Sequence, residues 1–266
     1  MEVCTVTQDA FFAAPPRDVF RIFTDARCHS AMSGGEHAEI DARVGGKFSG
    51  FEGAVTATFR ELVPERRIVQ LWRDTDWTPG HYAQLELQFA AVNQGRGTHV
   101  HLVLAGVPAG RAAQTANGWR DFYWVPIAEF LRDATVRPAR RYFLEFKKRA
   151  NLGVIDEVFA ENSVSHMLGR GPLTGREPQK TLGKLVFQAF EDIEIEVEDQ
   201  IVEGDRVVER HRSTGVHRGE FMGIAATGRR VSWTGNHIYR IAEGRIAEAW
   251  SEVSLYDLLA QLTATI

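Results

Sequence analysis

The sequence predicts helix followed by several strands, and this order occurs twice along the chain, beginning at residues 15–25 and again at 140–163. This repetition constrains the fold more than any other feature. Strand-like segments with turn signals between them fill residues 36–106 and lead into a long amphipathic helix at 117–133. A helical region and further strands then follow, without any sequence repeat between the halves. At 266 residues the chain is long enough for two domains. We predict two α+β domains, 1–134 and 139–266, with the boundary at "DATVRPAR" (133–140), which holds a proline and no large apolar cluster.

The first half contains clear periodic segments. "PPRDVFRIFTD" (15–25) begins with proline and predicts a helix whose apolar stripe is Val19, Phe20, Ile22 and Phe23. "YAQLELQFA" (82–90) alternates polar and apolar residues and predicts a strand with one face in water. The helix at 117–133 carries an apolar stripe of Trp119, Phe122, Tyr123, Ile127 and Leu131.

The second half predicts helices first and strands afterwards. The expected helical regions are 140–163 and 177–190, and the expected strands are 193–204, 206–217, 229–244 and 245–259. Because successive side chains of a strand point to opposite faces, three sets of residues each share a face. These sets are His211, Ser213 and His217; Trp233, Gly235, His237 and Tyr239; and Glu248, Trp250, Glu252 and Ser254.

Composition excludes several classes of protein. The net charge is −4 with acids and bases mixed along the chain, so we expect no nucleic-acid partner. The basic segment 137–149 interleaves apolar residues at helical spacing, which is typical of a solvated helix face. Cys4 and Cys28 cannot form a disulfide framework, the N-terminus does not resemble a signal peptide, and no long apolar run predicts a membrane span. We therefore expect a soluble cytoplasmic protein.

Three segments of the first half carry a family resemblance: "GGKFSGFEG", "ELVPERRIVQLWRDTDWTPGHYAQLELQF" and "GVP…GWRDFYWVPIAEFL". Over residues 8–132 the chain resembles the C-terminal domain of the activator of the ninety-kilodalton heat-shock chaperone ATPase, a member of the START-like (SRPBCC) helix-grip superfamily. The resemblance implies a curved seven-stranded sheet that grips the final helix, and the superfamily binds hydrophobic ligands. Eukaryotic members add an N-terminal chaperone-binding domain, for which we find no counterpart here. A chaperone partner is therefore a less favoured alternative.

Two features of the first half could suggest a site. His99 and His101 lie on one face of a strand, as metal ligands can, but no acidic or cysteine residue stands at ligand spacing. We interpret the pair as a strand face and expect no metal. Four tryptophans, Trp72, Trp77, Trp119 and Trp124, could line a ligand cavity, although aromatic residues at these spacings more often form the core.

The second half resembles the SnoaL-like polyketide cyclase family over residues 139–262. The resemblance rests on "HRGEFMGIAATGRRV" and "GNHIYRIAEGRIAEAW", which follow the family patterns "THxGxFxGIPPTGRxV" and "DxxRxxDGKIxExW". Val216 replaces the usual threonine, and Ala225 and Ala226 replace two prolines. The resemblance implies a conical α+β barrel that closes a ring by an intramolecular aldol-type reaction. No metal or cofactor takes part, because an acid/base residue moves the proton beside a carbonyl.

The residue that carries this acid/base role in the family is an aspartate four positions after the last-strand tryptophan. Counting from Trp250, that position is Ser254, and serine is a poor acid or base near neutral pH. Glu252 lies on the same strand face. We hypothesise that Glu252 replaces the carboxylate, with His217 and His237 as proton partners or donors to the carbonyl.

The alternative is that the carboxylate is lost and the pocket binds without catalysis. In that case His217 stabilises a turn, and Glu252 pairs with Arg240 or Arg245. The remaining residues that we expect to contact substrate are Trp250, Ser254, His166, His211, Trp233 and Tyr239, of which His166 matches a frequent family histidine.

The favoured function is therefore a cofactor-independent cyclase, isomerase or lyase acting on a small hydrophobic, polyketide-like carbonyl compound. The first domain would bind the ligand or serve assembly. The alternatives are a non-catalytic protein that binds hydrophobic small molecules and a chaperone-associated adaptor. Alternation in "IEIEVED", with Ile193, Ile195 and Val197 on one face, further predicts a homodimer through the outer face of the sheet.

Overall fold

The computed structural model describes residues 2–147, 150–167 and 171–264. The chain divides into two compact units, Met1–Asp133 and Ala134–Ile266, and the division falls inside helix α4 (Val125–Arg141). Two positions of the expected helical region at 140–163, namely 148 and 149, lie outside the described residues. No helix in the described ranges is long and apolar enough to cross a lipid bilayer.

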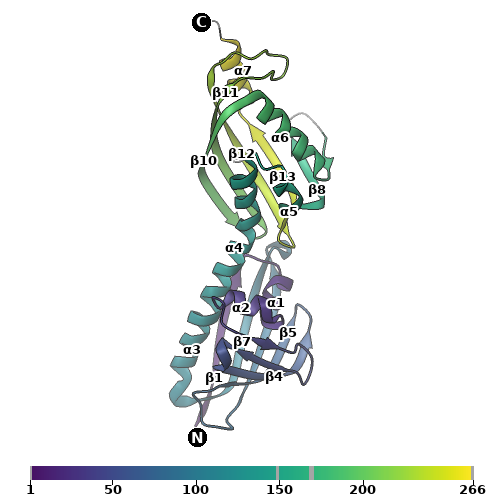
Figure 1. Ribbon diagram of the computed structural model, residues 1–266. Coiled ribbons are helices and arrows are strands. Elements are labelled where there is room, and N and C mark those ends of the chain that lie inside the picture. The colour runs from purple at the N-terminus through teal and green to yellow at the C-terminus, as the bar shows by residue number, and fades with distance from the viewer. Residues whose placement is uncertain (1, 148–149, 168–170, 265–266) are drawn as a thin grey trace. The chain divides into compact units, whose positions relative to one another are not determined.

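The first unit is built on one antiparallel sheet of seven strands in the order β1-β7-β6-β5-β4-β3-β2. Its helices lie on one face of this sheet (Figure 1). The strands are β1 (Val3–Phe12), β2 (Glu39–Ile40), β3 (Lys47–Gly50), β4 (Val55–Val63), β5 (Arg67–Asp74), β6 (Ala83–Val92) and β7 (Gly97–Pro108). The helices are α1 (Pro16–Thr24), α2 (Ala26–Met32) and α3 (Ala112–Trp119), followed by a π-helical turn (Arg120–Trp124) that leads into α4. The predicted helix-grip fold is confirmed.

The long C-terminal helix of this unit packs on the sheet through residues four positions apart. Trp119, Tyr123, Ile127 and Leu131 are all buried in one apolar cluster. Phe122, which we also expected on this stripe, is 61% exposed. It falls outside the four-residue spacing that places successive turns of a helix on one face.

The four tryptophans of the first unit belong to its core. Trp72, Trp77 and Trp119 are buried, and Trp124 packs against them. The ring centroids of Trp72 and Trp77 lie 5.2 Å apart, and those of Trp119 and Trp124 also lie 5.2 Å apart. Such distances are usual for aromatic side chains that pack on one another, so the structure supports the core interpretation of this cluster.

The second unit contains a six-stranded sheet in the order β10-β11-β12-β13-β8-β9, in which β13 and β8 run parallel and the other neighbouring strands run antiparallel. Figure 1 shows its long strands curving around the helices, as the predicted conical α+β barrel requires. The strands are β8 (Phe159–Met167), β9 (Leu173–Thr174), β10 (Phe190–Glu203), β11 (Arg206–His217), β12 (Arg230–Ala242) and β13 (Arg245–Val253). The helices are α5 (Val154–Val158), α6 (Glu177–Ala189) and α7 (Leu255–Thr263), besides the end of α4 and a π-helical segment (Tyr142–Lys147). The predicted α+β class is confirmed.

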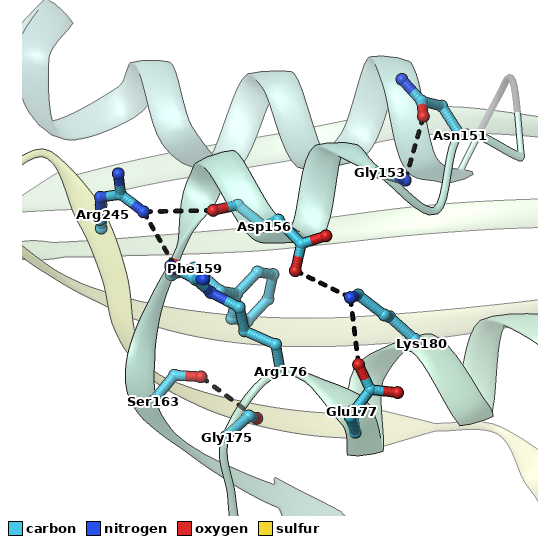
Figure 2. Close-up of polar contacts among 10 residues, drawn as sticks. All are labelled: Asn151, Gly153, Asp156, Phe159, Ser163, Gly175, Arg176, Glu177, Lys180 and Arg245. Atoms are coloured by element: carbon cyan, nitrogen blue, oxygen red, sulfur yellow. Dashed lines mark hydrogen bonds and ion pairs between the residues drawn. The ribbon is translucent and has the colours of Figure 1, made fainter.

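One expected helix ends earlier than the sequence suggests. We expected helix up to residue 163, but α5 ends at Val158 and β8 begins at Phe159. Two arginines from distant segments bind this corner (Figure 2). Arg176 donates to the carbonyl of Phe159 at 3.0 and 2.8 Å, and Arg245 donates to it at 3.4 Å. Cationic side chains stabilise the carbonyl end of a helix, so long-range contacts fix this boundary.

The last expected strand also ends early. We expected strand up to residue 259, but β13 ends at Val253 and α7 follows. Beyond that point two residues continue the hydrogen bonding of the neighbouring strand β12. Ser254 binds both backbone groups of Thr234, accepting from its N–H at the side-chain oxygen and donating its own N–H to the carbonyl. The side-chain amide of Gln261 binds the N–H and the carbonyl of Ser232 at 2.9 and 2.7 Å.

The residues on which we based a dimer do not form an outer face. Ile195 is buried opposite Ser213, and Ile193 packs against an apolar cluster inside the unit. Val197 is 36% exposed. This argument for a homodimer is therefore wrong, because β10 turns Ile193 and Ile195 toward the interior of the unit. The homodimer itself stays a prediction.

Candidate functional site

The candidate site lies on the inner face of the hairpin formed by β11 and β12. The two strands pair so that Glu209 stands opposite His237 and His211 stands opposite Gly235. Alternation then turns every second residue of both strands toward the interior. Glu209 and His211 are 1% and 3% exposed, and His237 is 7% exposed.

These polar residues form a band between two apolar clusters. The cluster at one end includes Tyr142, Phe159, Val207 and Ile241, and the cluster at the other end includes Phe190, Val231 and Leu258. The polar band consists of the inward side chains of Glu209, His211, Ser213 and His237. Burying ionisable groups is unfavourable unless their charges and hydrogen bonds are compensated, so such a band in a core indicates a site rather than packing alone.

His237 is held from two directions. Its ring stacks on that of His211, with 4.8 Å between the centroids and 3° between the planes. Its Nδ1 atom lies 2.9 Å from Oγ of Ser251 on β13. The stack needs a glycine at 235, because a Cβ atom there would lie 2.4 Å from Cε1 of His211. The imidazole of His237 therefore has a fixed place and orientation.

A second set of hydrogen bonds crosses the interior from the helices to the sheet. Tyr142 donates its hydroxyl hydrogen to Oε1 of Gln179 at 3.1 Å, and Nε2 of Gln179 donates to Oγ of Ser165 at 2.9 Å. Gln179 lies in the first turn of α6. The neighbouring residue, Lys180, forms ion pairs with Asp156 at 2.8 Å and with Glu177 at 3.1 Å, and these hold the start of the helix (Figure 2).

Tyr239 extends the band into the first of these apolar clusters. Its ring is 1% exposed and lies 5.8 Å from His237, nearly parallel to it at 14°. Burial raises the pKa of its phenol well above the ordinary value, and the charge of Glu209 and the neighbouring Tyr142 raise it further. The pKa of Tyr142 is also raised, mainly by burial and to a smaller extent by the charge of Glu209. Both phenols therefore keep their protons at neutral pH.

Glu252 does not lie with the histidines. It stands opposite Asn236 rather than His237, so it occupies the other face of the sheet, and it is exposed. The expectation that Glu252 meets His217 and His237 is therefore wrong. Alternation correctly placed Glu248, Trp250 and Glu252 on one face of β13, but it could not show that this face is the outer one.

Trp250 and His166 lie together on that outer face. Their rings stack with 5.1 Å between centroids and 3° between planes. Nε2 of His166 lies 2.9 Å from Oε1 of Glu248, and Oε2 of Glu248 accepts a hydrogen bond from Nε of Arg240 at 3.1 Å. Burial alone would raise the pKa of Glu248, but these two partners outweigh it and lower the pKa. Arg240, which we considered as a partner of Glu252, thus pairs with Glu248.

His217 stabilises a loop. The ring is fully buried, its Nδ1 lies 3.1 Å from Oγ1 of Thr227, and it accepts the N–H of Thr227 at 3.3 Å. Burial lowers its pKa, and a hydrogen bond with the backbone of Gly219 opposes this to a smaller extent. These contacts support the alternative that His217 holds the turn from 218 to 229.

Two other expected contact residues have structural partners. Ser254, at the position of the family aspartate, uses its hydroxyl oxygen to accept the N–H of Thr234 at 2.9 Å. Trp233 shares the inner face but packs 5.1 Å from Phe190 in the second apolar cluster. Of the expected site residues, the structure brings His211, His237 and Tyr239 together.

Sequence reasoning missed Glu209 of the band and four further polar residues of the same interior. Glu209 follows from the same alternation that placed His211 and Ser213, extended by one step toward the N-terminus. Tyr142, Gln179, Ser165 and Ser251 come from four other elements, and no local pattern marks them. Their convergence depends on how the helices pack and on strand register.

The histidine pair of the first unit has an acidic neighbour that the sequence spacing did not reveal. His99 Nε2 and His101 Nδ1 lie 2.7 and 2.9 Å from the same oxygen of Asp9 on the adjacent strand. These hydrogen bonds lower the pKa of Asp9, with His101 the larger contributor. In the described part of the chain, no set of three His, Cys, Asp or Glu side chains is arranged to hold a metal ion.

A surface hollow of about 450 Å³ lies elsewhere, along β10 and β11. Its lining residues are Ile193, Glu194, Ile195, Glu196, Arg212 and Thr214. None of the residues that we expected to bind substrate lines it.

Comparison with known families assigns both units. Residues 13–132 match the family described as activator of Hsp90 ATPase homolog 1-like protein, and residues 137–262 match the SnoaL-like polyketide cyclase family. The chain is a fusion of these two domains. Both predicted resemblances are confirmed, and we call the parts the activator-type domain and the SnoaL-like domain.

The curated relatives match the activator-type domain. The human activator of 90 kDa heat shock protein ATPase homolog 1 is 32% identical over 126 residues, which are 47% of this chain and 36% of the human protein. The chain thus spans about a third of the length of this relative.

Solved structures resemble each domain. An HSP90 activator from Plasmodium falciparum is 30% identical, covers 48% of this chain and 95% of its own, and has a TM-score of 0.46. A protein from Jannaschia sp. CCS1, provisionally described as a SnoaL-like polyketide cyclase, is 24% identical, covers 51% and 96%, and has a TM-score of 0.48.

Proposed function

We propose that the SnoaL-like domain catalyses proton transfer on a small hydrophobic, polyketide-like carbonyl compound, as a cyclase, isomerase or lyase that uses no cofactor. The observation that carries this proposal is the band of buried ionisable side chains enclosed by two apolar clusters. A general acid or base at such a position contributes about 10²–10⁴-fold to a rate. The family match of residues 137–262 supports the same reaction class.

His237 serves this function as a positioned imidazole. Stacking on His211 and contact with Ser251 hold the ring, so it can contact substrate without reorganisation. Preorganised polar groups stabilise developing charge more effectively than groups that must first reorient. The activator-type domain binds a ligand or serves assembly in this proposal. A cytoplasmic location and a homodimer stay predictions.

Hydrogen–deuterium exchange tests the reaction class without knowledge of the natural substrate. The full chain is incubated in D₂O with enolisable aromatic ketones, including 1-tetralone and 2-tetralone, and loss of the α-proton signals is followed by NMR. We expect exchange above the buffer rate, and we expect His237→Gln to lower it at least about tenfold. His37→Gln serves as the control, since the His37 side chain is 74% exposed.

Ligand binding separates this proposal from the non-catalytic alternative. A ketone that raises the melting temperature while its protons exchange only at the buffer rate would identify a binding protein. Exchange that persists unchanged in His237→Gln would argue against the interior band as the site.

A second candidate function is a chaperone-associated adaptor, favoured by the 32% identity of the activator-type domain to the human ATPase activator. The test adds the full chain to purified Hsp90 and measures ATP hydrolysis. Stimulation that rises with the concentration of the chain supports the adaptor. An unchanged ATPase rate, together with no co-sedimentation, contradicts it.

A further inference from the structure

Tyr239 carries a hydroxyl group that is buried in the interior of the SnoaL-like domain. The residue is 1% exposed, and its phenol oxygen has no hydrogen-bond partner among the residues that the structure describes. Tyr142, whose ring centroid lies 6.1 Å away, does donate its hydroxyl hydrogen, to Gln179. One of two neighbouring phenols in the same core is therefore satisfied by the protein, and the other is available to a ligand.

Glu209 is the carboxylate nearest to this hydroxyl in the strand register. Val207 stands opposite Tyr239 and Glu209 stands opposite His237, so Glu209 and Tyr239 are diagonal neighbours on the inner face. Diagonal pairs are within reach of long side chains. Burial raises the pKa of Tyr239 above its ordinary value, and the charge of Glu209 raises it further, in keeping with this diagonal placement.

Two oxygen-bearing residues that the sequence suggested for this role are excluded, one by its contact and the other by its position. Ser254 has its hydroxyl oxygen on the backbone of Thr234, and Glu252 lies on the exposed outer face. Neither can act on a molecule inside the domain. Glu209 is thus the carboxylate that the inner face of the β11–β12 hairpin supplies.

We infer that Tyr239 and Glu209 act as a pair on an enolisable ketone, Tyr239 as hydrogen-bond donor to the carbonyl oxygen and Glu209 as the base. This inference rests on the proposed function and names the residues and the substrate class for the same site. The substrate is an uncharged carbonyl compound with a proton on the adjacent carbon. A neutral carbonyl accepts the phenol hydrogen and brings no additional charge into the core.

The proton-transfer step conserves atoms and charge. Glu209 removes the proton from the carbon beside the carbonyl. The C–H electron pair becomes the C=C bond of the enolate, and the carbonyl π electrons move to the oxygen that accepts the hydrogen bond of Tyr239. Reprotonation by Glu209 at a conjugated position isomerises the substrate. Where the protonated Glu209 first exchanges its hydrogen with solvent, reprotonation at the same carbon in D₂O replaces the α-proton with deuterium. In a cyclisation the enolate carbon attacks a second carbonyl instead, and the new alkoxide takes the proton from Glu209.

The experiment compares two interior variants with two exposed controls in the full chain. Tyr239→Phe and Glu209→Gln each change one functional group, and Tyr256→Phe and Glu252→Gln make the same changes at exposed positions, Tyr256 being 85% exposed. The probe is 2-tetralone, whose α-proton exchange in D₂O is followed by NMR. We expect about a 10²-fold loss in Tyr239→Phe and a 10²–10⁴-fold loss in Glu209→Gln, with both controls within about threefold of wild type.

Binding of 2-naphthol, an aromatic analogue of the enol, separates the two roles. Tyr239→Phe is expected to weaken its binding about tenfold, whereas Glu209→Gln leaves it within about threefold. Melting curves confirm that the variants fold. Tyr239→Phe removes only an oxygen atom without a partner, so it decides the matter if Glu209→Gln does not fold.

Each outcome has one meaning. If wild type exchanges 2-tetralone and either interior variant keeps its rate within threefold, the inferred pair is wrong while the proposed function stands. If wild type exchanges none of the ketones above the buffer rate, the proposed function fails, and the inference fails with it.

Discussion

His211 lies against the backbone of Gly235, the residue opposite it on the next strand, and leaves no room there for a side chain. A Cβ atom at position 235 would lie 2.4 Å from Cε1 and 3.0 Å from Nε2 of the imidazole. A Cβ atom does not tolerate a non-bonded carbon atom closer than 3.0 Å, so the ring would have to move. The absence of one methyl group thus permits the stack of His211 on His237.

Gly235→Ala tests this relationship. Overpacking a buried site costs about 1–3 kcal/mol, and we expect that loss in the free energy of unfolding from urea titration. Exchange of 2-tetralone should fall as well, since His237 loses its support. Gly110→Ala is the control, because a Cβ atom at 110 meets no atom within 4 Å. Equal stability of the two variants would show that the ring moves freely.

Tyr142 and Tyr239 are both buried in the SnoaL-like domain, but we expect their replacement by phenylalanine to change the free energy of unfolding by different amounts. Tyr142→Phe removes the donor to Gln179 and should lower the free energy of unfolding by about 1–3 kcal/mol. Tyr239→Phe removes a hydroxyl group without a partner, so the free energy should stay the same or rise by up to about 1 kcal/mol. A similar loss in both variants would mean that Tyr239 is hydrogen-bonded in the folded protein.

His29 predicts a dependence of stability on pH. Burial lowers its pKa from 6.5 to about 4, and its hydrogen bond with the carbonyl of Ile22 opposes this only in part. Between pH 6.5 and 4 the unfolded chain therefore binds a proton that the folded chain does not. The His29 contribution is complete above pH 6.5 and decreases as pH falls toward 4, by at most about 1.4 kcal/mol per unit and about 3 kcal/mol in total.

The measurement is urea unfolding of the activator-type domain within the full chain, at several pH values. His29→Gln should remove this part of the pH dependence, whereas His37→Gln, at a mostly exposed site, should keep it. Identical slopes for wild type and His29→Gln would contradict the assignment.

Gln261 is expected to contribute to the stability of the SnoaL-like domain through Ser232. Gln261→Leu removes two hydrogen bonds to the backbone and should lower the free energy of unfolding by about 1–2 kcal/mol. Gln188→Leu makes the same change at an exposed position of α6 and should have little effect. Thermal melting of the two variants side by side checks this. Equal melting temperatures would show that water replaces the amide at no cost.

Much of the fold could be predicted from the sequence, because periodicity and family motifs report local structure. The alternation in 206–217 and 229–244 placed His211, His237 and Tyr239 on inward faces, where the structure has them. What alternation cannot report is which face of a strand turns inward. In β13, Ala249 and Ser251 face inward and Glu252 faces out, and small inward residues give no apolar signal.

Other features that the sequence did not predict depend on contacts between segments that are distant in the chain. The end of α5 is fixed by Arg176 and Arg245 at the carbonyl of Phe159, and neither arginine is near in sequence. Glu209 could have been found, since it continues the His211 series by one alternation step. The family pattern, by contrast, points to the position of Ser254 and carries no signal for residue 209.

The contacts of Ser254 and Gln261 with β12 have a consequence for solubility. β13 stops at Val253, opposite Gly235, so the preceding residues of β12 would otherwise present bare N–H and C=O groups along a sheet edge. Such an edge is a template for pairing with another molecule and a common origin of aggregation. By occupying the backbone of Thr234 and Ser232, one serine and one glutamine close that edge. The helix α7, which carries the glutamine, thereby protects the protein against intermolecular strand pairing.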